Sequence, residues 1–218
     1  MAILIKIHNG ILFFTGSLVL YTRFMGKRLL ILALTITFLL SSCSTTMTVK
    51  QQAAAPEKGE QIAIIQTNKG IIKMKFFPDY APETVKSFTE LAKKGFYNGL
   101  IFHRVIPGFM IQGGDPTGTG MGGETYKGPN TTLPNEVSKD LTHIQGAVAM
   151  ANKGDPITGS SQFYIVQNKA GAKSLDGGYT IFGQAYEGLD VVDAIANTPR
   201  DGQDRPKDPV IMEKITIQ

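Results

Sequence analysis

The sequence predicts a mainly β protein, a closed eight-stranded antiparallel barrel capped by two helices. From residue 61 onward, eight short segments are apolar or alternate apolar with polar residues, and two have apolar residues at helical spacing. Loops rich in glycine and proline separate these segments, as is typical of antiparallel β proteins. We expect a barrel rather than a sandwich because a closed sheet has no exposed edge strands.

The first two strands form a predicted hairpin. They have the sequences IAIIQT and IIKMKFF, with the turn TNKG between them. The first helix begins at Pro82, a residue favoured in the first helical turn, and ends before Gly95. The second helix is expected at residues 189–196, and the other strands at residues 101–106, 109–112, 144–150, 162–166, 180–185 and 210–217.

Excess positive charge is confined to the N-terminus. The first 42 residues contain Lys6, Arg23, Lys27 and Arg28 and neither Asp nor Glu. The remaining 18 basic residues therefore balance the 18 acidic ones, and they form no basic run. This neutral body argues against a nucleic-acid-binding protein.

Residues 25–42 have the pattern of a signal peptide. A short basic start, residues 25–28, precedes an apolar run of 12 residues that is too short to span a bilayer comfortably. The run ends in LSSC, residues 40–43, which resembles the lipobox of bacterial lipoproteins and implies acylation of Cys43. The alternative is that a cysteine follows the apolar run by chance. Because Cys43 is the only cysteine, a disulfide within the chain is excluded.

Two further segments complete the predicted domain organisation. Residues 1–24 contain an apolar run that a lipoprotein signal does not need, so we interpret them as an upstream extension and Met25 as the true start. An extended leader or a further membrane anchor is the alternative. Residues 43–60 comprise Cys43 and a polar, small-residue-rich segment without helical or strand period, which predicts a flexible tether with a reach of roughly 20 to 25 Å. Residues 61–218 form the folded domain.

The segment FHRVIPGFMIQGGD, residues 102–115, places one cation among apolar and amide side chains and supplies no nucleophile. As a strand, it would place Arg104 on one face with Phe102 and Ile106, and His103 on the other face with Val105. A guanidinium beside apolar side chains and a carboxamide provides a strong, permanently charged donor in a half-apolar pocket. This combination suits the binding and polarisation of a neutral amide.

Three further segments accompany it, with the sequences MANKGDPITGSSQFYIV (residues 150–166), SLDGGYTIFGQA (residues 174–185) and GTGMGG (residues 118–123). With these segments, residues 61–218 resemble a cyclophilin, the barrel-fold family of peptidyl-prolyl cis-trans isomerases. The resemblance covers nearly all of the folded region. It implies rotation about X-Pro bonds, with proline-containing polypeptides as partners and neither metal nor cofactor.

The resemblance also implies roles for single residues. Arg104 takes the place of the catalytic arginine, and Gln112 would orient it. Tyr179 replaces the family's pocket histidine and keeps an aromatic wall, whereas Ser174 stands where many members have Trp. The remaining implied residues are those of the proline pocket, Phe109, Met110, Tyr164 and Leu175, and those that bind the substrate backbone, Ala151, Asn152 and Gln162.

Other chemistries are less well supported by the sequence. His8, His103 and His143 are too scattered to suggest a metal site, and we interpret His103 as structural. Ser160 and Ser161 lack a nucleophile elbow. The glycine-rich segment lacks the ending of a phosphate loop, and we interpret it as a flexible loop beside the substrate groove.

The leading hypothesis is a monomeric, membrane-anchored extracytoplasmic lipoprotein that isomerises X-Pro bonds in exported or envelope proteins and so assists their folding. Ser44 after the lipidated cysteine favours the outer membrane, facing the periplasm, if the cell has two membranes. The alternatives are a non-catalytic chaperone or surface lipoprotein that binds proline segments in the same groove, and a purely structural envelope lipoprotein.

Overall fold

The computed structural model describes residues 46–152, 154 and 159–218. The predicted upstream extension, the signal peptide and Cys43 lie outside the described residues. The helices and strands are α1 (Val49–Ala53), β1 (Ile62–Thr67), β2 (Gly70–Phe76), α2 (Pro82–Lys93), β3 (Phe102–Ile106), β4 (Met110–Gly113), β5 (Glu124–Thr125), β6 (Gly128–Pro129), β7 (Ala147–Met150), β8 (Phe163–Val166), the 3-10 helix η1 (Lys173–Leu175), β9 (Ile181–Glu187), α3 (Leu189–Ala196) and β10 (Met212–Ile217).

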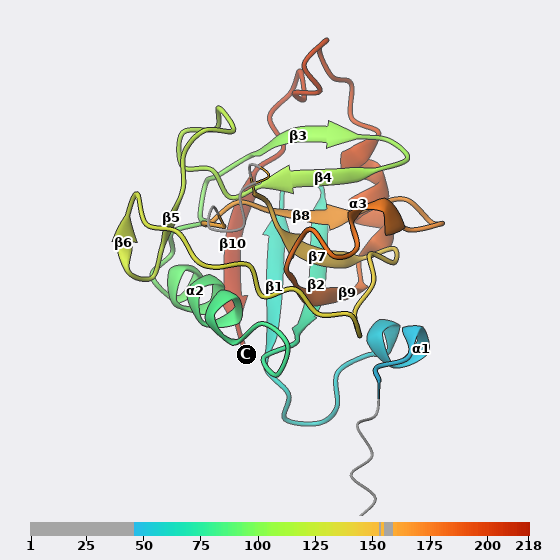
Figure 1. Cartoon of the computed structure of the whole chain (residues 1–218). Coiled ribbons are helices and arrows are strands. Elements are labelled where there is room, and N and C mark those ends of the chain that lie inside the picture. Colours follow the sequence, from blue (N-terminus) through green and yellow to red (C-terminus); the bar gives the residue numbers. More distant parts are fainter. Residues whose placement is uncertain (1–45, 153, 155–158) are drawn as a thin grey trace, which may run out of the picture. The chain divides into compact units, whose positions relative to one another are not determined.

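Eight strands form one strongly curled antiparallel sheet in the order β10-β1-β2-β9-β7-β8-β4-β3, as Figure 1 shows. The prediction of a mainly β, eight-stranded antiparallel fold is therefore confirmed. At the two ends of the sheet, an isolated bridge pairs Ile101 with Ile211, and the Phe102 N–H donates to the Val210 carbonyl over 2.9 Å. A complete ladder between β3 and β10 is not among the pairings of the described strands, so the closed barrel stays a prediction.

The concave side of the sheet encloses an apolar core. Phe88 of α2 lies at its centre, with ring centroids 4.9 Å from Tyr97, 5.4 Å from Phe163 and 5.3 Å from Phe182. We call this group of buried side chains the interior cluster; from β3, β4, β7 and β8 it includes Val105, Ile111, Val148 and Ile165.

Helix α2 is fixed at its N-terminus by a side chain from a distant loop. The backbone N–H groups of Glu83 and Thr84 donate to the Glu136 carboxylate over 3.0 and 2.8 Å. These N–H groups have no partner within the helix, and a carboxylate also suits the positive end of the helix dipole. Glu136 thus orients α2, which contacts β9 and β10 and places Phe88 in the core.

A second apolar group covers the opposite face of β4, β7 and β8. Because side chains alternate along a strand, Met110 lies on this face and Ile111 in the interior. In the same way, Tyr164 lies on this face and Ile165 in the interior. We call this group the outer cluster; its buried members are Phe77, Met110, Leu141, Ala147, Ala149, Tyr164, Val166, Ala172 and Ile181. The same sheet therefore supports an apolar group on each face.

Strand β3 contains an irregularity that alternation alone did not predict. Phe102 pairs with Gly113 and Arg104 with Gln112, so His103 is an extra residue relative to β4. Such a bulge changes the face to which the next side chain points. Phe102 therefore belongs to the interior cluster with Val105, and the expectation that it shares a face with Arg104 was wrong.

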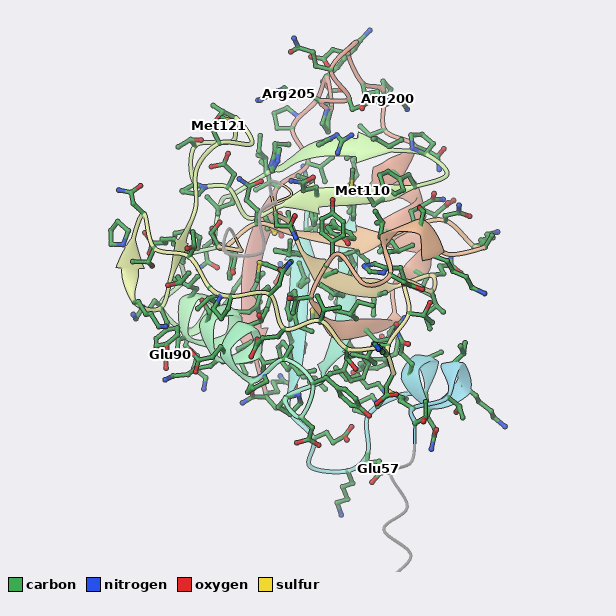
Figure 2. All side chains as sticks on the ribbon, viewed as in Figure 1. Glu57, Glu90, Met110, Met121, Arg200 and Arg205 are labelled. Carbon is green, nitrogen blue, oxygen red and sulfur yellow. The ribbon has the colours of Figure 1, made fainter. Side chains whose placement is uncertain are left out.

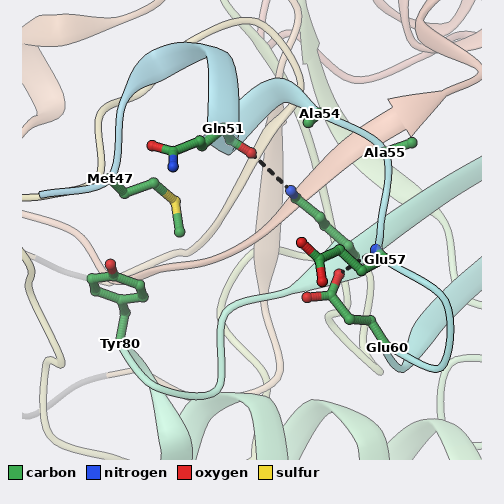
Figure 3. A pocket seen from close by; sticks show the side chains of 8 residues that line it. Met47, Gln51, Ala54, Ala55, Glu57, Glu60 and Tyr80 are labelled. Carbon is green, nitrogen blue, oxygen red and sulfur yellow. Dashed lines mark hydrogen bonds between the residues drawn. The ribbon is translucent and has the colours of Figure 1, made fainter. Parts of the chain in front are cut away.

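The N-terminal segment differs from the expected flexible tether over its described part. Residues Val49–Ala53 form α1, and Thr48 and Gln51 cap it through reciprocal hydrogen bonds between side chain and backbone. The Lys75 ammonium donates to the Gln51 carbonyl over 2.9 Å, and Met47 lies near Tyr80 in the pocket of Figure 3. The folded unit therefore begins before residue 61.

The short strands β5 and β6 and the 3-10 helix η1 were not predicted, because two- and three-residue elements leave no periodic pattern. Within the described residues, no helix is long and apolar enough to cross a membrane.

Candidate active site

Arg104 lies in a row of side chains that crosses three strands. It pairs with Gln112 of β4, which in turn pairs with Tyr164 of β8. Residues directly opposite one another in a ladder share a face, so the three side chains lie on the face of the outer cluster. The exposed fraction of the Arg104 side chain is 44%, whereas Tyr164 is only 4% exposed. The row thus runs from an exposed cation to a buried aromatic ring.

The outer cluster contains all the aliphatic and aromatic residues predicted for the proline pocket. Met110 and Tyr164 are buried members, and the half-buried members that pack against them include Phe109, Ala151, Leu175 and Tyr179. The rings of Tyr164 and Tyr179 meet edge to face, with centroids 5.7 Å apart. Residues separated by up to 70 positions in the sequence thereby form one half-exposed apolar surface.

A tight turn places Phe109 at this surface. Pro107 and Gly108 occupy its centre, and Gly108 has a φ of +74°, which glycine adopts without steric cost. The Gly108 N–H donates to the Gln167 side chain over 2.7 Å, and the Phe109 carbonyl accepts from the Gln167 N–H over 2.9 Å. These bonds hold the turn against the end of β8.

A chain of amides lies beside Arg104. The Gln112 Nε2 donates to the Gln162 Oε1 over 3.0 Å, and the Gln162 Nε2 donates to the Gly122 carbonyl over 2.7 Å. The Ala151 N–H donates to the Gln162 backbone carbonyl over 2.9 Å. The amide orientations are therefore set by a continuous series of donors and acceptors.

A cleft of about 270 Å³ adjoins these amides. Its lining includes Gln112, which was predicted to orient Arg104, and the three residues that were predicted to bind the substrate backbone, Ala151, Asn152 and Gln162. Asn130, Thr131, Thr132 and Ser160 also line the cleft, and the sequence analysis did not predict them. The remaining lining residues are Gly120, Met121, Gly122 and Gly123 of the glycine-rich loop. The glycine-rich loop thus lies beside the candidate groove, as expected.

The Asn152 side chain is used to connect loops. Its Nδ2 donates to the Gly178 carbonyl over 3.0 Å, and its Oδ1 accepts from the Gly154 N–H over 2.9 Å. It therefore has the local hydrogen bonds of a turn residue. The carboxamide of Asn152 is therefore engaged within the fold.

Asp115 orders the glycine-rich loop. It is 1% exposed, and its carboxylate accepts from the Thr117 N–H over 2.8 Å and from the Gly120 N–H over 2.5 Å. Burial alone would raise the pKa of Asp115, but the hydrogen bonds from Thr117, Gly122 and Gly120 outweigh burial and lower it. An ionised Asp115 therefore holds one wall of the cleft.

Asp204 is a further residue near Arg104 that the sequence analysis missed. Its Oδ2 lies 3.8 Å from the Arg104 Nε, and its carbonyl accepts from the Val105 N–H over 2.8 Å. Arg205 of the same loop donates to the Gly118 carbonyl over 2.6 Å; Figure 2 labels Arg205 and, on the glycine-rich loop, Met121. The charged loop at residues 197–209 thus lies against β3 and the glycine-rich loop.

The two described histidines are both buried. His103 is 6% exposed and its Nδ1 is the one buried side-chain polar atom without a hydrogen-bond partner in the described part of the chain. Burial lowers the pKa of His103, although Asp115 opposes this shift. No group of three or more His, Cys, Asp or Glu residues among those described is close enough to hold a metal ion.

The comparisons with known proteins agree with this geometry. Residues 62–217 match the family model described as cyclophilin type peptidyl-prolyl cis-trans isomerase/CLD. The chain belongs to this family. It is a cyclophilin-type peptidyl-prolyl cis-trans isomerase, as the resemblance of its motifs implied.

Bacterial relatives carry corresponding names. A Staphylococcus saprophyticus protein named for peptidyl-prolyl cis-trans isomerase activity is 41% identical over 198 residues, which are 78% of this chain and 99% of that protein. A Streptococcus pyogenes protein named for both phosphatase and isomerase activities is 43% identical over 180 residues. This second match covers 70% of this chain but only 38% of the longer protein.

Solved structures extend the likeness to the fold. A crystal structure of a Cryptosporidium parvum cyclophilin type peptidyl-prolyl cis-trans isomerase has a TM-score of 0.69 and 38% identity, covering 73% of this chain and 98% of that one. A crystal structure of the same protein in the presence of the dipeptide Ala-Pro has a TM-score of 0.68 and 36% identity, covering 72% and 98%.

Proposed function

We propose that Arg104 catalyses rotation about X-Pro bonds of exported or envelope proteins, and that the protein assists the folding of these clients at a membrane surface. The observation that carries the catalytic part is the row from Arg104 through Gln112 to Tyr164, which joins an exposed guanidinium to an apolar pocket wall. The presence of Ala-Pro with a related isomerase supports proline-containing peptides as substrates.

The catalytic role follows from the electronic structure of the peptide bond. Resonance of the nitrogen lone pair gives the C–N bond partial double-bond character and a rotation barrier of ~18–20 kcal/mol. A guanidinium that donates to the prolyl nitrogen withdraws the lone pair from this resonance. The lone pair is most available when the bond is twisted, so the donation stabilises the transition state more than the ground state. The step needs no proton transfer and no nucleophile.

The remaining residues hold the substrate during this rotation. Phe109, Met110, Tyr164, Leu175 and Tyr179 bind the proline ring through apolar contact. Gln112 orients the guanidinium. Gln162, Ala151 and the backbone of Asn152 bind the substrate backbone. The proline ring and the preceding chain are then held separately, so that the carbonyl between them can rotate.

The membrane location rests on the lipobox that ends at Cys43. Acylation of Cys43 would anchor the chain, and α1 shortens the predicted tether because the described fold already begins with Met47 and Thr48. Four residues, 44–47, then separate the lipidated residue from the capped helix, and they extend over at most about 14 Å. The domain would work close to the membrane, at a shorter distance than a free segment of residues 44–59 allows.

An isomerisation assay on an X-Pro peptide tests the catalytic proposal. We expect Arg104→Ala to lower kcat/KM about 100-fold, the size of effect seen when a transition-state donor is removed. Lys73→Ala is the matched control, because it removes a surface cation of β2 that pairs with Glu187, and we expect it to retain full activity. Binding of the peptide without acceleration by the wild type would favour the non-catalytic chaperone instead.

Fractionation of cells that express the full chain tests the membrane proposal. We expect Cys43→Ala to leave the membrane fraction or to accumulate as an unprocessed precursor. Unchanged membrane attachment with normal processing in this variant would refute lipidation at Cys43.

A further inference from the structure

A polar network lies directly behind the candidate proline pocket. At its centre is His143, whose side chain is 0% exposed. The His143 Nδ1 lies 2.6 Å from the Asp176 Oδ1, and its Nε2 lies 2.9 Å from the Tyr164 hydroxyl. The imidazole therefore connects a partly exposed carboxylate to the ring that forms the inner wall of the pocket.

The direction of these hydrogen bonds follows from Asp176. Its carboxylate accepts from the Thr142 hydroxyl over 2.5 Å and from the His143 N–H over 2.8 Å. Burial alone would raise the pKa of Asp176, but the bonds from Thr142 and His143 outweigh burial and lower it, so Asp176 is ionised. An ionised carboxylate only accepts, so the His143 Nδ1 carries the proton and Nε2 accepts from the Tyr164 hydroxyl.

The network determines where the Tyr164 ring lies. The hydroxyl is fixed by His143, and the two rings are nearly parallel, with centroids 5.9 Å apart and an interplanar angle of 13°. Tyr179 meets Tyr164 edge to face at an angle of 84°. The hydroxyl and the ring contacts together leave Tyr164 one position, with the ring in the outer cluster beside Met110 and Phe109.

Helix α1 fixes the other end of the network. Gln52 is 1% exposed; its Nε2 donates to the Thr142 carbonyl over 2.8 Å, and its Oε1 accepts from the Thr142 N–H over 3.2 Å. The Gln52 carboxamide thus satisfies both backbone groups of Thr142. Thr142 precedes His143, and its hydroxyl is the group that donates to Asp176. The match to the family model begins at residue 62, so α1 lies outside the matched region.

We propose that Asp176 and His143 are positioning residues of the isomerase, which hold the Tyr164 ring through its hydroxyl, and that Gln52 anchors them to the N-terminal segment. The inference rests on the proposed assignment of Tyr164 to the proline pocket. It gives the N-terminal segment a role in substrate binding that is separate from membrane attachment.

Steady-state kinetics on an X-Pro peptide test this inference in the full chain. Tyr164→Phe keeps the ring and removes the hydroxyl, and Asp176→Asn weakens the acceptor of the His143 proton. We expect each variant to raise KM about three- to tenfold, as for the loss of one hydrogen bond, with kcat within about threefold because Arg104 is untouched. Asp208→Asn, which changes an exposed carboxylate, should leave both constants unchanged.

A double variant separates a connected network from two independent contacts. If Asp176 acts through the Tyr164 hydroxyl, Asp176→Asn has little further effect on KM in the Tyr164→Phe background. If the increase in KM of the double variant is the product of the two single increases, the inference is overturned. An unchanged KM in Tyr164→Phe would overturn it as well. We also expect Gln52→Ala to raise KM. If this variant lowers thermal stability but leaves KM unchanged, Gln52 has a purely structural role.

Nitrogen NMR of the wild-type histidine rings gives a test that is independent of folding in the variants. We expect His143 to be neutral, with the proton on Nδ1 and an unprotonated Nε2. The opposite tautomer would contradict the network. If Arg104→Ala keeps full activity, the proposed catalytic role fails whatever these variants show; if it loses activity while Tyr164→Phe behaves as wild type, only the network inference fails.

Discussion

The two faces of the curled sheet differ in what holds their side chains. The interior cluster consists of apolar side chains around Phe88, Phe163 and Phe182 that pack against one another. The outer cluster is also apolar at its centre, but hydrogen bonds hold the residues around it. Examples are the bond between His143 and the Tyr164 hydroxyl and the bond from the Gly108 N–H to the Gln167 side chain. The interior therefore contributes mainly stability, and the outer face has its shape set by polar contacts that can be changed one at a time.

The largest effect on stability is expected in the interior. Phe88 is fully buried and lies against four other aromatic rings. Phe88→Ala should lower the free energy of unfolding by about 3 to 5 kcal/mol, as for other Phe-to-Ala changes in cores. Urea denaturation followed by circular dichroism measures this, and a loss below about 1 kcal/mol would show that the interior is not a tightly packed core.

The opposite pattern is expected for the outer cluster. Phe109 is only half-buried, so Phe109→Ala should change the free energy of unfolding by about 1 kcal/mol, while kcat/KM falls about tenfold through loss of contact with the proline ring. Ile71→Ala is the control, because Ile71 is 49% exposed on β2, and both quantities should stay unchanged. If Phe109→Ala loses stability but not activity, the division between the two faces is wrong.

A smaller effect is expected from acidification, which should lower the folding stability through the buried His143 behind the outer cluster. Burial lowers the pKa of His143 below its ordinary value of 6.5, although Asp176 opposes the shift, and Tyr164 and Tyr179 are the other groups facing the ring. The unfolded chain then takes up protons before the folded one, so stability is complete above about pH 6.5 and falls as the pH decreases below it. Asp176, whose pKa is also lowered, contributes in the same direction at lower pH.

Thermal unfolding between pH 7 and 5 measures this effect. His103 has a lowered pKa as well and contributes with the same sign, so the variant His143→Gln should reduce the fall in Tm without abolishing it. A Tm that rises on acidification would contradict the buried, neutral state of both histidines.

The difference between the faces also explains what the sequence could predict. The apolar runs at residues 109–112 and 162–166 correctly predicted β4 and β8, where alternation separates Ile111 and Ile165 from Met110 and Tyr164. The bulge at His103 was not predictable, because an extra residue depends on the pairing with β4 and reverses the face of Phe102.

Polar contacts over long sequence distances were the other source of error. Helix α1 lacks an apolar face and is held by Gln52, which bonds to Thr142 across 90 positions. Asp204 lies near Arg104 only because the loop before β10 pairs with β3. Neither contact has a periodic signal, whereas the placement of Phe109 followed from the recognisable Pro107-Gly108 turn.

The most direct test of the account is to measure binding and rotation in the same sample. Exchange NMR on an Ala-Pro peptide gives the cis-trans exchange rate, and titration of the same peptide gives Kd. For Arg104→Ala we predict a Kd within about threefold of wild type and an enzyme-catalysed exchange rate about 100-fold lower, because the proline pocket is intact and the donor to the prolyl nitrogen is lost. An unchanged exchange rate at unchanged Kd would contradict catalysis by Arg104.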